Sequence, residues 1–235
     1  MITDELIKKI PKKDLKDLYI FDAHAAVASL KNPGKTEGKP LPKGNPNKKP
    51  FIVLFRHGQS EDNIKRIHSG WRDDTRLTEV GIEQAKVLEP KLRNIDFDYY
   101  FQSDQYRSQQ TLKLAMGSRS YTPITDWRLK ERNYGVLNGT SKEELLKKHP
   151  LLAVLYRRSW NYPPPLGESL EMVYYRVLPF IKELVYVLKK ENASAVLSVS
   201  NNSMKAIRAY FEDLKPKEIT VLENPTGKDY CLYNL

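Results

Sequence analysis

The chain has little of what would cross-link it or hold it in a membrane. Its 235 residues include one cysteine, Cys231, so no disulfide can form within the chain. The four histidines are scattered without zinc-ligand spacing, so we expect no metal. No apolar run approaches the roughly 20 residues that a membrane-spanning helix needs, and no signal-peptide pattern opens the sequence. We therefore expect a cytoplasmic protein with no membrane partner.

Arginine is absent from the first 50 residues, which differ in composition from the rest. They hold 11 lysines and 6 acidic residues, so 11 minus 6 gives +5, half of the total net charge of +10. Residues 32–50 are rich in proline, glycine and lysine, which favours an extended linker, whereas residues 15–30 contain enough apolar side chains to dock on a main domain. We predict a basic N-terminal extension over residues 1–50 and a single folded domain over residues 51–235.

The excess of positive charge narrows the classes of binding partner. A net charge of +10 is compatible with nucleic acid or with a small anionic substrate. The sequence contains no nucleic-acid-binding motif, and several arginines have a better use in a phosphate pocket. We therefore expect a small phosphorylated substrate and no nucleic acid, and a homo-oligomer stays open.

From residue 51 onward, short apolar runs alternate with helical patterns. Strands are predicted at 51–55, 97–101, 193–199 and 230–233, and helices at 78–93, 104–116, 141–149, 168–190 and 202–213. Thr78, Ser141 and Ser169 are expected N-caps, and Ser141 with Glu144 predicts a capping box. This alternation predicts an α/β fold, a three-layer sandwich with a mainly parallel central sheet.

Arg56, His57 and Gly58 follow directly on the first predicted strand. Open α/β sheets bind ligands at the carboxyl edge of their strands, so this strand end places a guanidinium, an imidazole and a side-chain-free backbone amide around one point. A neutral imidazole can attack phosphorus, and an arginine can hold phosphate oxygens through two parallel hydrogen bonds. The motif therefore predicts a phosphate site.

Further motifs follow in a recognisable order. They are Asn63, Gly70-Trp71-Arg72-Asp73, Leu77-Thr78-Glu79-Val80-Gly81, Ser103-Asp104-Gln105-Tyr106-Arg107 with Thr111, Lys130-Glu131-Arg132-Asn133-Tyr134-Gly135, Tyr156-Arg157-Arg158-Ser159, Pro163-Pro164-Pro165, Gly167-Glu168-Ser169 and Asn202-Ser203. Together they resemble the histidine phosphatase superfamily and, within it, the cofactor-dependent phosphoglycerate mutases, over residues 51 to about 233. The resemblance implies the phosphoglycerate mutase-like fold.

The resemblance also implies roles at the phosphate end of the site. The histidine of Arg-His-Gly takes the phosphoryl group in this family, so His57 is the predicted nucleophile. Arg56 and Arg107 match the two arginines that hold the phosphate, and Asn63 matches a further phosphate-pocket residue. Two guanidiniums aimed at the charge on the phosphoryl oxygens provide the preorganised stabilisation that phosphoryl transfer requires.

Other matching residues have roles in proton transfer and substrate binding. Glu131 matches the general acid and base, a role that near neutral pH requires a pKa raised by burial or by phosphate charge. Tyr134 and Asn202 match residues that contact the substrate. The cations that match those binding the substrate carboxylate and second phosphate are Arg132, Lys142, Arg157 and Arg158.

These matches imply a phosphoglycerate mutase, an isomerase of glycolysis and gluconeogenesis. It would interconvert 3-phosphoglycerate and 2-phosphoglycerate through phospho-His57, primed by the cofactor 2,3-bisphosphoglycerate and without a metal. Two alternatives stay open. One is a phosphomonoesterase acting on a small phosphorylated acid, and the other is a catalytically impaired binder of a phosphorylated metabolite.

One position departs from the family pattern. The second catalytic histidine of the family belongs to a His-Gly-Asn-Ser-like turn after a late strand, and here the matching stretch is Ser200-Asn201-Asn202-Ser203. Ser200 thus stands where that histidine is expected. Losing one transition-state donor typically costs about 10²–10³ in rate, so we expect a slowed chemical step unless neighbouring amides compensate.

Overall fold

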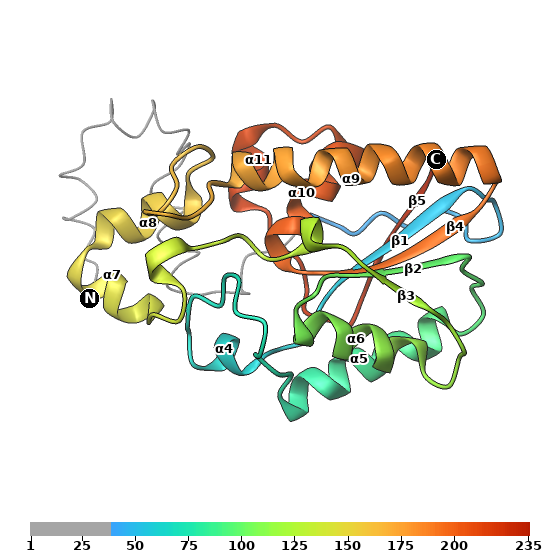
Figure 1. The fold of residues 1–235 in the computed structure, drawn as a ribbon, viewed down its shortest axis with the longest axis horizontal. Coiled ribbons are helices and arrows are strands. Elements are labelled where there is room, and N and C mark those ends of the chain that lie inside the picture. The colour runs from blue at the N-terminus through green and yellow to red at the C-terminus, as the bar shows by residue number, and fades with distance from the viewer. Residues whose placement is uncertain (1–38) are drawn as a thin grey trace.

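A single five-stranded sheet forms the centre of the protein in a computed structural model that describes residues 39–235 (Figure 1). Its strands are β1 (Phe51–Arg56), β2 (Tyr99–Gln102), β3 (Pro123–Thr125), β4 (Ser194–Val199) and β5 (Cys231–Asn234). They lie in the order β3-β2-β4-β1-β5, and every neighbouring pair is parallel except β1 with β5. The α/β fold with a mainly parallel sheet is therefore confirmed.

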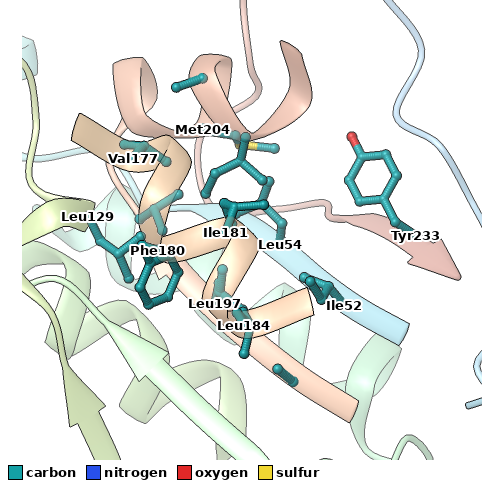
Figure 2. Packing of buried hydrophobic residues seen from close by; sticks show 14 of the residues in the cluster. Ile52, Leu54, Leu129, Val177, Phe180, Ile181, Leu184, Leu197, Met204 and Tyr233 are labelled. Carbon is teal, nitrogen blue, oxygen red and sulfur yellow. The ribbon is translucent and has the colours of Figure 1, made fainter. Parts of the chain in front are cut away.

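Helices cover both faces of this sheet. The face under α9 (Leu170–Glu191) and α10 (Asn201–Glu212) receives Ile52 and Leu54 of β1, which belong to one hydrophobic cluster with Phe180 and Ile181 of α9 (Figure 2). Phe51, Val53 and Phe55 point the other way, toward α5 (Glu79–Leu92) and α6 (Tyr106–Met116). Because side chains alternate along a strand, an apolar run like that of β1 suits a strand covered on both faces.

The predicted helix starts agree with the structure. The Thr78, Ser141 and Ser169 side chains each accept a hydrogen bond from the backbone N–H three residues further on. Ser141 begins α7 (Lys142–Lys148), where the Glu144 carboxylate lies 4.0 Å from Lys148 Nζ. The predicted capping box is therefore half formed, with the serine as cap and the glutamate turned along the helix.

Several short elements were not predicted from the sequence. They are α4 (Glu61–Ile64), β3, the 3-10 turns η1 (Trp127–Leu129) and η2 (Gly135–Leu137), α8 (Pro150–Arg158) and α11 (Pro216–Val221). Most are too short to show a hydrophobic period. In α8 a proline at the first position fits the helix, because the missing N–H has no partner there in any case. The helices α7 and α8 lie beyond one end of the sheet (Figure 1).

Residues 39–50 run along β5. The backbone of Leu232 accepts a hydrogen bond from Gly44 N (3.0 Å) and donates one to Pro42 O (2.8 Å). Lys43 Nζ lies 2.7 Å from Asp229 Oδ1. This part of the predicted linker is thus attached to the sheet edge, with turns and bends over residues 46–50. The predicted docking of residues 15–30 lies outside the described residues.

The strand ends bring the motifs together at one place. β1, β2 and β4 run in parallel, so the residues that follow them lie at the same edge of the sheet. His57 follows β1, Arg107 lies at the start of α6 just after β2, and Ser200 follows β4. No helix within residues 39–235 is both long and apolar enough to span a bilayer.

Candidate active site

A cavity of about 720 Å³ opens at this carboxyl edge. Most of the residues singled out in the sequence line it: Arg56, His57, Asn63, Arg107, Glu131, Tyr134, Lys142, Arg157, Arg158 and Asn202. Two others, Arg132 and Ser200, are buried and do not line the cavity. The structure therefore gathers residues from across the sequence around one space.

His57 is held in a single tautomer. Its Nδ1 lies 2.7 Å from the carbonyl oxygen of Gly58, and because a carbonyl only accepts, we assign the ring proton to Nδ1. The other nitrogen, Nε2, accepts a hydrogen bond from Arg107 Nε at 3.3 Å. Burial, together with the charges of Arg107 and Arg56, holds the pKa of His57 well below its ordinary value. The imidazole is therefore neutral, with a lone pair on Nε2.

Gly58 does not supply the ligand-binding backbone amide that the sequence predicted. Its backbone N–H donates to Thr111 Oγ1 at 3.1 Å, so it is not a free amide for a ligand. A Cβ at this position would lie 2.3 Å from the carbonyl oxygen of Gly81 in α5. The glycine is therefore required by the close approach of two backbones, which fixes the loop that carries His57.

Two arginines, the half-buried Arg56 and the buried Arg107, flank the imidazole. Arg56 donates from Nη1 to the Asn224 carbonyl at 3.0 Å, while its Nε is buried and has no hydrogen-bond partner among residues 39–235. Arg107 donates to the carbonyls of Arg72 (3.0 Å) and Gly70 (3.2 Å). A buried donor without an acceptor is rare in native proteins, and a bound anion would satisfy it. The Arg56 guanidinium thus fits a phosphate oxygen.

Asn63 also has donors to spare. Its Oδ1 accepts from the backbone N–H of Ser60 at 3.1 Å, which turns the side chain and leaves the amide NH₂ group at the cavity wall. An asparagine in this state can donate to a phosphate oxygen.

Glu131 lies in the segment between η1 and η2, and its carboxylate accepts four hydrogen bonds. The donors are Arg132 N (2.8 Å), Asn201 N (3.1 Å), and the backbone N (3.3 Å) and Nδ2 (2.5 Å) of Asn202. Burial raises the pKa of this carboxyl, but the hydrogen bonds and the charges of Arg107 and Arg56 outweigh burial and lower it. The raised pKa that a general acid needs is thus absent without a ligand, and burial alone does not supply it.

A second group of cations lies at the α7 and α8 side of the cavity. Burial, followed by the charge of Arg157, lowers the pKa of Lys142 to about 7. Burial, followed by the charge of Arg158, lowers the pKa of Arg157 to about 10. Cations placed this close repel one another, which costs free energy unless an anion binds between them.

Arg132 and Arg158 differ from Lys142 and Arg157 in the groups that they contact. The Arg132 guanidinium lies 4.5 Å from the Tyr134 ring centroid and is 1% exposed. Arg158 Nη2 lies 2.9 Å from Glu223 Oε1, so its charge is balanced within the protein. Of the four cations predicted for the substrate's far end, Lys142 and Arg157 alone both line the cavity and lack an acidic partner among the described residues.

Ser200 does not donate into the cavity. It is fully buried, and its Oγ donates to Gln105 Oε1 at 3.0 Å. The same Gln105 oxygen accepts a hydrogen bond from Glu131 N (2.8 Å), and Gln105 Nε2 donates one to the Gly70 carbonyl (2.8 Å). The serine hydroxyl therefore helps to support Glu131, and the nearby amides of Asn201 and Asn202 reach the cavity instead.

Two residues at the cavity wall escaped the sequence reasoning. Lys205 lies on α10, and Glu223 precedes the Asn224-Pro225 turn before β5. The helical spacing could have revealed Lys205, because it follows Asn202 by three residues and so shares its face of the helix. Nothing in the local sequence indicated that Glu223 would meet Arg158.

Within the described part of the chain, no group of three histidine, cysteine or acidic side chains could hold a metal ion. A doubly anionic small molecule fits better. The phosphate end has the unpaired Arg56 Nε, and the other end has Lys142 and Arg157 without acidic partners among the described residues.

Comparison with known proteins places this geometry in context. Residues 52–232 match the sequence profile of the Histidine phosphatase superfamily (branch 1). A 2,3-bisphosphoglycerate-dependent phosphoglycerate mutase of Nitrobacter winogradskyi is 38% identical over 183 residues, covering 75% of this chain and 88% of the relative. The enzyme of that name from Cytophaga hutchinsonii is 35% identical over 181 residues, covering 76% and 84%.

Solved structures show the same fold in more distant proteins. A mycobacterial glucosyl-3-phosphoglycerate phosphatase superposes with a TM-score of 0.70 at 23% identity, over 77% of this chain and 90% of that one. A putative alpha-ribazole-5'-P phosphatase from Escherichia coli gives a TM-score of 0.68 at 22% identity, over 79% and 95%. At these identities the likeness concerns the fold alone.

Proposed function

The chain belongs to the histidine phosphatase superfamily, and we propose that it interconverts 3-phosphoglycerate and 2-phosphoglycerate through a phosphohistidine at His57. One observation carries the proposal: a single cavity holds a neutral histidine between Arg56 and Arg107 at one end, and Lys142 with Arg157 at the other. A three-carbon acid that carries both a phosphate and a carboxylate suits both ends.

In the proposed reaction, phospho-His57 passes its phosphoryl group to the free hydroxyl of 3-phosphoglycerate. The Nε2 lone pair then attacks the other phosphorus, an N–P bond forms, the bond to the substrate oxygen breaks, and 2-phosphoglycerate is released. The Nδ1–H bond to the Gly58 carbonyl stabilises the positive charge that the ring acquires. Arg56 and Arg107 balance the charge on the phosphoryl oxygens. When bound, 2,3-bisphosphoglycerate supplies the phosphoryl group that primes His57.

Glu131 would deliver a proton to the leaving oxygen and remove one from the hydroxyl that takes the phosphoryl group back. Its lowered pKa without a ligand makes it a base. A bound phosphate brings negative charge beside the carboxylate and offsets the nearby arginines, so the pKa of Glu131 rises when substrate is present. The acid form therefore arises together with the substrate that needs it.

Lys142, Arg157 and Tyr134 would orient the glycerate part. A carboxylate placed between these two cations, which have no acidic partner among residues 39–235, fixes which hydroxyl faces His57. With both oxygens of the glycerate within reach of His57, one oxygen can accept a phosphoryl group while the other gives one up, and the reaction is an isomerisation.

Hydrolysis of a larger phosphorylated acid is the second candidate, and the size of the cavity favours it. Cavities of roughly 300–1,000 Å³ usually hold ligands larger than a three-carbon acid. Lys39, Leu41 and Asp229 also line the cavity of about 720 Å³. Such room admits a substituted glycerate, and it also admits water to the phosphohistidine.

Product analysis separates these two functions. Incubation with 3-phosphoglycerate and a trace of 2,3-bisphosphoglycerate, followed by ³¹P NMR, should show 2-phosphoglycerate growing to its equilibrium share. A His57→Ala variant is the control for contaminating activity. Inorganic phosphate as the sole product would reject the mutase and support the phosphatase.

A further inference from the structure

Lys205 is a buried lysine at the cavity wall. It lies on α10, is 2% exposed, and lines the same space as His57 and Glu131. No hydrogen bond or ion pair among residues 39–235 involves its ammonium group. The charged groups that act on it come from three segments: Glu223 before β5, Arg158 of α8, and Arg132 with Glu131 between η1 and η2.

Glu223, the acid that acts most strongly on Lys205, forms an ion pair with another cation. Glu223 Oε1 lies 2.9 Å from Arg158 Nη2, and Arg158 Nη1 also donates to the Thr220 carbonyl at 3.3 Å. Burial raises the pKa of Glu223, but the charges of Lys205 and Arg158 outweigh it and lower that pKa to about 2. Arg56 acts on Glu223 as well, so one carboxylate faces three cations, and the one that it directly contacts is Arg158.

Lys205 is therefore a buried cation that no acidic group among residues 39–235 directly contacts. Burying an ammonium group without a hydrogen-bonded acid is costly, and burial lowers the pKa of Lys205 to about 7. Such a group is found where a ligand supplies the missing charge. Arg158, a charged neighbour of Lys205, follows Arg157 on α8, whereas Glu223 acts on Arg56 as well, so it is Arg158 that associates Lys205 with the α7 and α8 side of the cavity.

We propose that Lys205 binds the second anionic group of the ligand, at the end away from His57, in the place that the sequence had assigned to Arg158. This inference rests on the proposed function and deepens it: the far end recognises a carboxylate or a second phosphate through Lys142, Arg157 and Lys205. Glu223 keeps Arg158 as a structural cation in the wall.

Calorimetric titration of the full chain tests the proposal with three probes that differ in one group at a time. 3-Phosphoglycerate carries both anions, glycerol 3-phosphate lacks the carboxylate, and inorganic phosphate reports the His57 end. Lys205→Met keeps the length of the side chain and removes the charge. Lys205→Arg restores it, and Lys217→Met removes an exposed charge from α11 as the matched control.

For Lys205→Met we expect the affinity for 3-phosphoglycerate to fall by about 10- to 100-fold, the usual worth of a hydrogen bond to a charged group. Affinity for glycerol 3-phosphate and inorganic phosphate should change less than about twofold on the same scale. Arg at position 205 should recover most of the loss, and Lys217→Met should match wild type. 2,3-Bisphosphoglycerate in a further titration shows whether a second phosphate uses the same lysine.

Thermal unfolding distinguishes a binding role from a structural one. If Lys205 exists for a ligand, removing a buried unpaired charge should leave the melting temperature unchanged or raise it. Wild-type affinity of Lys205→Met for 3-phosphoglycerate, or an equal loss for all three probes, would overturn the inference while leaving the mutase proposal standing. Wild-type protein that binds phosphate but not 3-phosphoglycerate would overturn both.

Discussion

His68 offers a quantitative test of how the site is held together. The ring is fully buried, packs 5.0 Å from the Tyr134 ring centroid, and lies with its Nδ1 3.3 Å from the Thr140 carbonyl oxygen. Burial lowers its pKa to about 3, and the charges of Lys142 and Arg157 lower it in the same direction. A protonated His68 would add another cation to the group that we propose binds the substrate.

The lowered pKa makes His68 a source of acid instability. Between pH 3 and the ordinary pKa of 6.5, the unfolded chain binds a proton at this residue and the folded chain does not, so stability rises with pH in that window. Each pH unit is worth about 1.36 kcal/mol, and two units below 6.5 the cost reaches about 2.7 kcal/mol. Above pH 6.5 the contribution of this titration vanishes.

Replacement by phenylalanine keeps a ring against Tyr134 and removes the titration. The free energy of unfolding, measured by urea denaturation at about pH 8 and about pH 4.5, should fall less for His68→Phe than for wild type, by about 2.7 kcal/mol. His149→Phe, at an exposed histidine, is the control. If the difference between His68→Phe and wild type were the same at both pH values, the burial and charge argument for His68 would be refuted.

Three further substitutions test separate parts of the site. Glu131→Gln should lower kcat by about 10²–10⁴ with little change in substrate affinity, because it removes the proton donor; steady-state kinetics and calorimetry measure the two effects. Ser200→Ala should change kcat by less than about threefold, since its hydroxyl serves Gln105; a loss of 10²-fold, of the order of a transition-state donor, would contradict that assignment. Gly58→Ala should destabilise the fold by about 1–3 kcal/mol in urea, because the new Cβ meets the Gly81 carbonyl; unchanged stability would show that the two backbones separate freely.

Local patterns in the sequence predicted what local physics determines. An apolar run ending in Arg56 and His57 was enough to predict a strand whose end carries the site, because a buried strand must stop where polar side chains begin. Helix caps at Thr78 and Ser169 were predictable for the same reason, since each cap depends on a backbone N–H three residues away. The order of motifs predicted the family.

Pairings between distant residues were not predictable in this way. Arg158 meets Glu223 across 65 positions and Ser200 meets Gln105 across 95, and each pair depends on the packing of several elements. These contacts change what the motifs can do. The first pairs a predicted substrate ligand with an acid of the cavity wall, and the second turns the position of the expected histidine into a support for Glu131.

The proposed reaction depends on His57 as the residue that carries the phosphoryl group. Wild-type protein incubated with ³²P-labelled 2,3-bisphosphoglycerate and digested after an alkaline quench should give one labelled peptide, acid-labile and alkali-stable, that contains His57. The label should pass to unlabelled 3-phosphoglycerate in a chase, and His57→Ala should carry none. Label that survives in His57→Ala, or a folded wild-type protein that binds 2,3-bisphosphoglycerate and never becomes labelled, would contradict the account.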